Sequence, residues 1–411
     1  MGVFHNDMGI REKWQTFLEI DSPEPTKEDY YIRLVNSLLK GALEAGASDI
    51  HIEPYKESAY RIRLRKDGVM VSYMRLNAED YVGVTGRLRV LAKMDISDSG
   101  KPDDGSFAKE IAGHFISFRV SQMPTVRGLK LVLRILDERR FGKSLEALGI
   151  GGTDCHKLRQ MLSEKSGLIL VAGATGSGKT TTLYSLLKEL DKERLNIVTI
   201  EDPVEYLIDG ISQTEVSRSQ RIDFSKGLRA LLRQDPDVIL IGEIRDELTA
   251  STAIRAAMTG HLVLSTIHTE DAPSAIVRLK NMGIQPYMIS AGLRGVLAQR
   301  LFRKKCPVCR QKRALEKGTA VKSFEGAKET GNDASSVCPL CRGQKTIGRK
   351  AYFELLECSE AIKKACFSET IDLYQLALKE GMQPMSEQIR AAVSANEIEI
   401  EEGLTIDEVG R

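Results

Sequence analysis

Gly173-Ala-Thr-Gly-Ser-Gly178-Lys179-Thr180 decides the fold of this chain. The stretch fits the phosphate-loop pattern G-x-x-x-x-G-K-[ST], and it lies between an apolar run at 167–171 and a predicted helix. Glycines let the backbone turn its N–H groups around phosphate oxygens, and the following helix adds the positive end of its dipole. The pattern therefore predicts a nucleotide site in an α/β domain, rather than a glycine-rich turn without a ligand.

The side chains of this loop have distinct tasks in phosphate binding. Lys179 can reach the β- and γ-phosphates of a nucleotide, and the Thr180 hydroxyl suits a Mg²⁺ ligand. We therefore expect ATP and Mg²⁺ as cofactors. The residues expected at the nucleotide are Gly173, Ala174, Thr175, Gly176, Ser177, Gly178, Lys179, Thr180 and Thr181.

Short apolar runs separated by helical segments continue after the loop. A run that is apolar throughout and only a few residues long is typical of a strand buried on both faces of a parallel sheet. The sequence therefore predicts that residues 153–411 form an α/β domain around a parallel sheet. Its strand candidates are 167–171, 196–200, 238–241 and 262–265.

Two acidic side chains follow strand candidates. Glu201 and Glu243 each come directly, or after one glycine, behind an apolar run. Carboxylates at the carboxyl ends of parallel strands point into the crevice where such sheets bind ligands. We expect Glu243 to hold Mg²⁺ through water and Glu201 to orient the attacking water. The alternative for each is a strand-end ion-pair partner. Asp237 precedes its strand and is interpreted as a turn residue.

Two histidines flank the last strand candidate. His261 precedes it and His268 follows it. Such a pair suits a switch that senses the γ-phosphate, whereas lone histidines are more often structural. Composition alone leaves both interpretations open.

The residues before the loop have the pattern of a separate small α+β domain at about 29–140. Alternating apolar and charged residues indicate strands, and Lys66-Asp67-Gly68 between two of them is a strong hairpin signal. We interpret residues 1–28 as an arm and 141–152 as a linker, and we expect residues 350–411 to be mainly helical. The predicted elements are a helix at 31–45, strands at 48–54, 60–65 and 69–74, a helix at 78–93, and strands at 115–121 and 130–136.

Four of the seven cysteines form two C-x-x-C pairs. In a reducing cytosol such pairs are typical of a metal site rather than of disulfides, and four thiolates complete the tetrahedral shell of Zn²⁺. We expect a structural zinc site within 306–341, with reduced free thiols or redox chemistry as the alternatives. A redox role needs only one pair. The expected ligands are Cys306, Cys309, Cys338 and Cys341.

Composition and patterning exclude several classes of protein. Lys+Arg of 59 against Asp+Glu of 57 leaves a net charge of +2, which gives no case for direct nucleic-acid binding. No apolar stretch approaches the roughly 18–20 residues that cross a bilayer, and the N-terminus lacks the pattern of a secretory signal. We expect a cytoplasmic protein that meets a membrane through a partner.

Four elements together resemble the secretion ATPases of type II secretion and type IV pilus assembly, from about residue 30 to 390. They are the phosphate loop (GATGSGKTTTLY, 173–184), an Asp box (NIVTIEDPVEY, 196–206), a Walker B stretch (LLRQDPDVILIGEIRD, 231–246) and a His box (TGHLVLSTIHTEDA, 259–272). SDIHIEP at 48–54 and the stretch 119–134 resemble the second N-terminal domain of that family. The tetracysteine region resembles its zinc-binding segment.

The resemblance implies a hexameric, RecA-like ATPase on the cytoplasmic face of the inner membrane. It gives Lys179 and Thr180 the phosphate and Mg²⁺ roles. It also implies that Glu201 is the general base, Glu243 the Walker B acid and His268 the His-box residue. ATP hydrolysis would then drive an inner-membrane platform that extrudes pilin-like subunits. The tetracysteine segment favours assembly over pilus retraction.

The resemblance also implies that the small domain presents Arg119 and Arg134 to bound nucleotide. The alternative is that both arginines face solvent on alternating strands. The run 99–106 lacks most of the positive charge that the family carries there, and Leu129 stands where the family usually has glutamate. Two other functions stay open: a DNA-uptake or nucleic-acid motor, and a nucleotide-binding regulator that hydrolyses ATP poorly.

Overall fold

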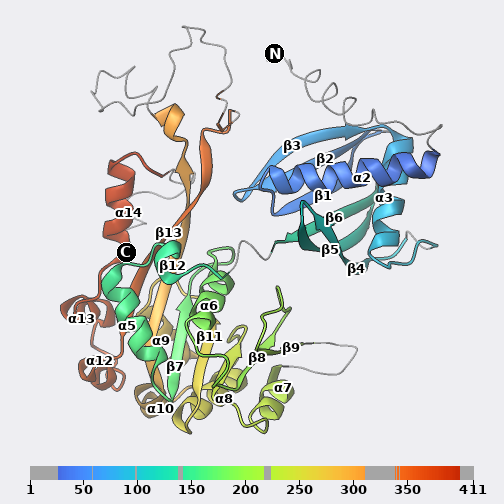
Figure 1. Cartoon of the computed structure of the whole chain (residues 1–411). Coiled ribbons are helices and arrows are strands. Elements are labelled where there is room, and N and C mark those ends of the chain that lie inside the picture. The colour runs from blue at the N-terminus through green and yellow to red at the C-terminus, as the bar shows by residue number, and fades with distance from the viewer. Residues whose placement is uncertain are drawn as a thin grey trace, which may run out of the picture. The chain divides into compact units, whose positions relative to one another are not determined.

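The computed structural model describes residues 26–398 apart from 58, 98–99, 138–141, 217–223, 311–337, 339 and 342. The chain divides into two compact units, residues 1–138 and 139–411, and each is described by itself (Figure 1). The predicted arm at 1–28 lies almost wholly outside the described residues. No helix in the described part of the chain is both long and apolar enough to cross a membrane.

The small unit is an antiparallel sheet of six strands in the order β3-β2-β1-β6-β5-β4, with two helices packed against one face. Alternate strand residues such as Ile50, Ile62 and Leu133 are buried in the core with residues of the helices, while many of the residues between them carry charge. This is the pattern of a sheet with one covered face. Its elements are α2 (Lys27–Glu44), β1 (Asp49–Lys56), β2 (Ala59–Lys66), β3 (Val69–Leu76), α3 (Ala78–Leu91), β4 (Asp103–Ile111), β5 (His114–Thr125) and β6 (Gly128–Leu136).

Three details of this unit differ from the predictions. α2 begins at Lys27 rather than at residue 31, because Thr26 and Asp29 form a capping box. β1 continues past Pro54, because its register with β2 is irregular just after the proline. β4 was not predicted, and it covers the second half of the run 99–106. Its sequence is a weak strand former, but it pairs with β5 over its full length.

The second unit is built on a sheet of seven strands in the order β13-β12-β7-β11-β10-β8-β9. Only β13 is antiparallel to its neighbour. All four strand predictions are confirmed, as β7 (Gly167–Ala172), β8 (Ile197–Glu201), β10 (Val238–Ile241) and β11 (Leu262–Ile267). Side chains of β7 alternate between two separate apolar cores, so helices cover both faces of this sheet. The α/β fold class is therefore confirmed.

The remaining elements of this unit surround the four predicted strands. They are α4 (Leu145–Leu148), α5 (Gly152–Leu162), α6 (Lys179–Lys188), β9 (Ser212–Glu215), α7 (Phe224–Leu231), α8 (Glu247–Met258), α9 (Ser274–Asn281), α10 (Pro286–Gly292), β12 (Leu293–Lys305), β13 (Thr346–Glu357), α12 (Glu360–Ala365), α13 (Leu373–Lys379) and α14 (Met385–Ser394).

The prediction of a mainly helical region at 350–411 is wrong for its first part, where β13 runs to Glu357. β13 pairs with β12 from Gly295↔Glu357 to Lys305↔Thr346. Its Leu and Glu residues favour helix locally, but this pairing buries Phe353 and Leu355, so tertiary structure overrides propensity. The two strands form a long pair (Figure 1). The cysteine segment is therefore an insertion between neighbouring strands of one sheet.

Part of the expected linker at 141–152 belongs to the second unit. α4 lies within it, with Ser144 capping its first turn and Gly149 ending it at φ 98°. Leu145 and Ile150 are buried in the apolar core that also contains residues of β7 and α6. These residues are therefore part of the packed second unit, because burying two large apolar side chains fixes them to its core.

Candidate active site

The glycine-rich loop joins the end of β7 to the start of α6, as predicted. Gly173, Gly176 and Gly178 have positive φ values of 148°, 80° and 91°, which side chains with a Cβ rarely adopt. A Cβ on Gly173 would also lie 2.6 Å from the carbonyl oxygen of Gln299 on β12. The loop needs glycine both for its turn and for its close approach to β12.

The Lys179 ammonium group is held against the loop that precedes it. Its Nζ donates to the carbonyl oxygens of Gly173 (2.8 Å) and Ala174 (3.0 Å). Burial lowers the pKa of Lys179, and the charge of Glu243 acts in the opposite direction. The buried Ser177 Oγ has no hydrogen-bond partner among the described residues. A partly desolvated cation, an orphaned hydroxyl and a glycine cradle fit a phosphate group.

The ends of β10 and β11 bring the predicted Walker B acid and His-box histidine together. His268 Nε2 lies 3.7 Å from an Oε of Glu243, and Arg245 forms an ion pair with the same carboxylate. Burial lowers the pKa of His268, and the charge of Lys179 lowers it further. Both effects favour the neutral imidazole, whereas the charge of Glu243 favours the protonated one. Arg245 was not predicted.

Glu201 ends β8, but its carboxylate is engaged in a separate buried network. It accepts hydrogen bonds from the hydroxyls of Tyr184 and Thr199 (2.7 Å) and from the amide of Gln213 (3.3 Å). The residue is 3% exposed, and burial raises its pKa. A Cβ on Gly242 would lie 3.3 Å from Glu201 Cα, which leaves little space for an acid at that position. This geometry fits a structural acid, and the role of general base stays a prediction.

His261 and Asp237 precede their strands and have structural partners. His261 Nδ1 lies 3.1 Å from the carbonyl oxygen of Ala256 in α8. Asp237 accepts a hydrogen bond from the Asn196 N–H at 2.8 Å. The two histidines therefore differ: only His268 follows its strand, at the end where Glu243 also lies.

Gln299 is a residue at the phosphate loop that sequence reasoning missed. Its amide contacts both the loop and the first turn of α6, through Ser177 and Thr182. No local sequence motif predicts this role, because it depends on β12 lying beside β7 in the sheet. The glycines of the loop indicate that another segment lies close to it, but they do not identify that segment as β12.

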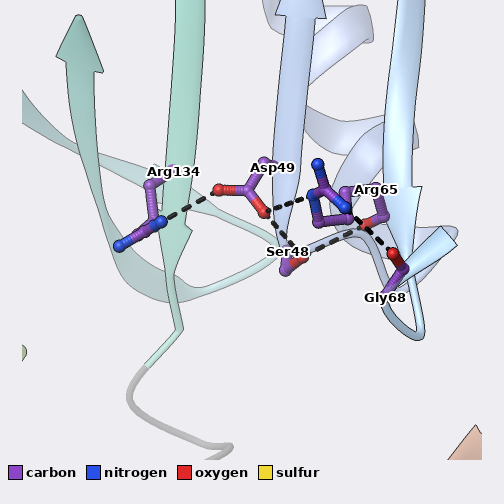
Figure 2. Close-up of polar contacts among 5 residues, drawn as sticks. All are labelled: Ser48, Asp49, Arg65, Gly68 and Arg134. Atoms are coloured by element: carbon purple, nitrogen blue, oxygen red, sulfur yellow. Dashed lines mark hydrogen bonds and ion pairs between the residues drawn. The ribbon is translucent and has the colours of Figure 1, made fainter. Parts of the chain in front are cut away.

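Arg119 and Arg134 lie directly opposite each other on β5 and β6 of the small unit. Figure 2 shows the Arg134 guanidinium beside the carboxylate of Asp49, at 3.2 Å from Nε to Oδ1. The other oxygen of Asp49 lies 3.8 Å from Nε of Arg65 and accepts a hydrogen bond from the Ser48 hydroxyl at 2.8 Å. Like charges opposite each other destabilise a sheet. Asp49 supplies the opposite charge beside Arg134, and the role of both arginines at bound nucleotide stays a prediction.

The four predicted zinc ligands lie together, with all Sγ atoms within 4.8 Å of one another. Cys306 and Cys338 are 3.8 Å apart, and Cys309 and Cys341 are 3.5 Å apart. Tetrahedral Zn–S bonds of about 2.3 Å place sulfur atoms about 3.8 Å apart, so the spacing fits zinc. The Lys345 N–H donates to the Cys341 sulfur at 3.3 Å, and backbone N–H groups lower the pKa of Cys338 to about 7.

Comparisons with known proteins place the chain in a family. The family model described as "Type II/IV secretion system protein" matches residues 24–405. The chain is 41% identical over 362 residues to the type II secretion system ATPase E of Vibrio cholerae, covering 88% of this chain and 70% of that protein. It is 40% identical over 373 residues to the type IV pilus assembly ATPase TfpB of Acinetobacter baylyi, covering 89% and 63%. The crystal structure of the pilus retraction motor PilT with bound ADP is similar, with a TM-score of 0.63, 28% identity, and coverage of 91% and 95%.

Proposed function

Because the chain belongs to the type II/IV secretion system protein family, we propose that it works as a hexameric, Mg²⁺-dependent ATPase that powers pseudopilus or pilus assembly. ATP hydrolysis is the reaction of this family, and the chain is an enzyme of that kind. The hexamer, the residue roles and the partners below are proposed for this chain.

The observation that carries the proposal is the gathering of three motif residues beside one glycine loop. Lys179 follows β7, Glu243 follows β10 and His268 follows β11. These strands are neighbours in the order β7-β11-β10, and they are parallel, so their carboxyl ends meet at one edge of the sheet. Such an edge, with a glycine loop and a cation, supports a site for nucleotide phosphates.

The side chains divide the work of hydrolysis between binding and charge stabilisation. Lys179 exchanges its loop carbonyl partners for the β- and γ-phosphates, with the loop amides around them. Mg²⁺ would be held by the Thr180 hydroxyl and, through water, by Glu243, and it supplies positive charge to phosphate oxygens. His268, with Nε2 3.7 Å from the Glu243 carboxylate, is placed to respond to the γ-phosphate. Glu201 would orient the attacking water once its carboxylate is released from Tyr184.

The small unit would contribute Arg119 and Arg134. Phosphoryl transfer spreads negative charge over the transferred group, and a delivered guanidinium can be worth about 10³–10⁵ in rate. The ion pair with Asp49 fixes the direction of the Arg134 side chain without covering it, because that side chain is 62% exposed. Such an arginine is available to an incoming phosphate.

The cysteine cluster supports assembly rather than retraction as the task of the machine. We propose that Cys306, Cys309, Cys338 and Cys341 hold a structural zinc ion at the end of the β12–β13 pair. The chain is more similar to the secretion and assembly ATPases, at 41% and 40% identity, than to the retraction motor at 28%. The proposed partner is an inner-membrane platform, with the protein bound peripherally to its cytoplasmic face.

Turnover and assembly state of the purified chain test this function together. Mg²⁺-dependent ATP hydrolysis should rise more than linearly with protein concentration as rings form, because family sites lie near subunit boundaries. Light scattering with a non-hydrolysable ATP analogue should show a hexamer. A strictly monomeric species with full activity would contradict the ring, and absence of Mg²⁺-dependent turnover at any concentration would contradict the ATPase.

A further inference from the structure

Gln299 occupies the point where β12 leaves its neighbour β7. The parallel pairing of these strands ends at Ala298↔Ala172, and the phosphate loop begins with the next residue, Gly173. Gln299 therefore lies beside the start of the loop. It is 1% exposed, which is rare for a glutamine unless both ends of its amide are satisfied.

Both ends of the Gln299 amide contact the segment that binds phosphate. Nε2 donates to the Ser177 carbonyl oxygen at 2.5 Å, and Oε1 accepts a hydrogen bond from the Thr182 hydroxyl at 2.7 Å. Ser177 lies in the loop and Thr182 lies in the first turn of α6. One side chain thus ties the loop to the helix whose N-terminus faces the phosphates.

The backbone of β12 constrains the same loop from the same side. A Cβ on Gly173 would lie 2.6 Å from the Gln299 carbonyl oxygen, and one on Gly178 would lie 3.3 Å from its Nε2. Contact with the Gln299 backbone therefore requires glycine at position 173, and the Gln299 side chain leaves little space beside Gly178. A loop pressed against a fixed strand keeps one conformation, so less ordering entropy is lost when a ligand binds.

We propose that Gln299 is a positioning residue for the phosphate loop. It holds the Ser177 carbonyl outward and the first turn of α6 in place, so that the loop amides point inward before nucleotide arrives. The inference rests on the proposed function of the loop as the nucleotide site, and it adds a residue outside every motif of that site. Gln299 itself does not contact phosphate.

The amide chemistry is specific, because one atom must donate and the other must accept. Methionine has nearly the same length and volume but cannot do either. Glutamate keeps the acceptor but places a negative oxygen against the Ser177 carbonyl. Either change leaves the carbonyl without its donor in a buried position.

Affinity for a non-hydrolysable ATP analogue, measured by titration calorimetry with Mg²⁺, tests the proposal. We expect Gln299→Met to weaken binding by about 10-fold or more, and Gln299→Glu to weaken it further. Turnover at saturating ATP should fall less than affinity, because the positioned loop acts mainly on binding. A merely structural glutamine would lower thermal stability without this split between Kd and kcat.

Gln122 offers a matched control on β5 of the small unit. It is also 1% exposed and its Nε2 donates to the Lys101 carbonyl oxygen at 2.9 Å, but its Oε1 has no hydrogen-bond partner among the described residues. Gln122→Met should also lower the unfolding temperature, by the loss of one buried hydrogen bond, but leave nucleotide affinity unchanged. If wild type and Gln122→Met bind the analogue and Gln299→Met binds it equally well, the positioning role is overturned while the nucleotide site stands. If wild type does not bind, the proposed function itself fails.

Thr182 provides a second route if Gln299→Met does not fold. Thr182→Val removes the hydroxyl that orients the amide, and Thr182→Ser keeps it. We expect Thr182→Val to weaken analogue binding several-fold and Thr182→Ser to restore it to near wild type. Equal affinities of the two Thr182 variants would overturn the proposal.

Discussion

The two sheets of this protein place their charged residues in different ways. In the seven-stranded sheet, the central strands are buried on both faces, and Lys179, Glu243 and His268 lie beyond the strand ends. In the six-stranded sheet, charged side chains alternate with apolar ones along the strands, as Arg61, Arg63 and Arg65 do along β2. Asp49 and Arg134 lie within the two central strands, near their ends. The parallel sheet thus brings its charged side chains together at one edge, whereas the antiparallel sheet, with one covered face, distributes them over the uncovered face.

This difference determines whether a neighbouring residue can compensate when one charged side chain is removed. At the edge of the parallel sheet each side chain has one position relative to the loop. On the open face of the small unit, neighbouring strands repeat the same side-chain type. Arg119 lies opposite Arg134, and Arg65 lies on the far side of Asp49. We therefore expect single changes at the edge to abolish activity and single changes on the open face to reduce it.

Lys179→Ala should have the largest effect. Removing the ammonium should lower turnover by roughly 10²–10³-fold or more, because no other lysine follows the glycines of the loop. The steady-state rate of Mg²⁺-ATP hydrolysis is the measurement, with circular dichroism to show that the fold persists. Lys188→Ala is the control, since Lys188 lies on the same helix and donates to the Gly142 carbonyl oxygen at 2.7 Å. Substantial turnover by Lys179→Ala would remove the lysine from the site.

Glu201→Gln should follow, with turnover lowered by roughly 10²-fold and nucleotide affinity retained, if Glu201 orients the attacking water. The comparison variant is Glu205→Gln, four residues further on and less buried. Full turnover by Glu201→Gln would assign it to the structural network with Tyr184. A loss seen only in Glu205→Gln would assign the water-orienting acid to Glu205.

The pH dependence of stability tests the burial of the Glu201 carboxyl group independently. Burial raises its pKa, so the native state keeps the proton at a higher pH than the unfolded chain. This stabilising contribution is fully present below the unfolded pKa and is lost as pH rises through the raised native pKa. We expect the difference in unfolding temperature to move in favour of Glu201→Gln as pH rises from about 4 to 8. A difference independent of pH would contradict a carboxyl group that titrates in the core.

Arg134→Ala should be milder than either edge variant. We expect turnover to fall by about 10-fold, because Arg119 lies opposite and keeps a guanidinium on the same part of the face. Changing both arginines to alanine should approach the roughly 10³-fold loss of a missing arginine finger. Arg61→Ala is the control, since Arg61 is on β2 and binds Glu53 at 2.9 Å. Equal rates of Arg61→Ala and the double variant would leave both arginines as solvent-facing residues.

The same difference explains what could be predicted from the sequence. The central parallel strands were found because apolar runs followed by acids are local patterns, and the glycine loop identified the site. β12 and β13 were missed, because residues such as Arg300 and Glu354 break the apolar pattern and favour helix. The role of Gln299 could not be predicted, because it depends on which strand lies beside the loop.

The buried network around Glu201 was missed for a similar reason. Tyr184 and Gln213 are distant from Glu201 in sequence, and neither belongs to a motif that assigns them a partner. The capping box at Thr26 was visible in the sequence but lay just before the predicted helix. Local signals thus fixed elements and strand-end residues, whereas contacts between side chains of different elements needed the fold.

Loss of zinc should have the smallest effect on the nucleotide site, although β12 contacts the phosphate loop and also ends next to Cys306. Purified protein should contain about one zinc ion per chain, and Cys338→Ser should lower that content and make 306–341 sensitive to protease. Metal binding supplies on the order of 10 kcal/mol to the folding of a structural site. The part of β12 beside the phosphate loop is held independently of the end that leads to the cysteines, because β12 pairs with β7 up to Ala298 and with β13 from Gly295 onward. Affinity for the ATP analogue should therefore change less than about twofold, well below the effect expected of Gln299→Met.

Cys155→Ser is the control, since Cys155 is buried on α5 and outside the cluster. Absence of zinc in reductively purified protein would reject the metal site. A large loss of nucleotide affinity in Cys338→Ser would show that the cysteine end of the β12–β13 pair controls the phosphate loop.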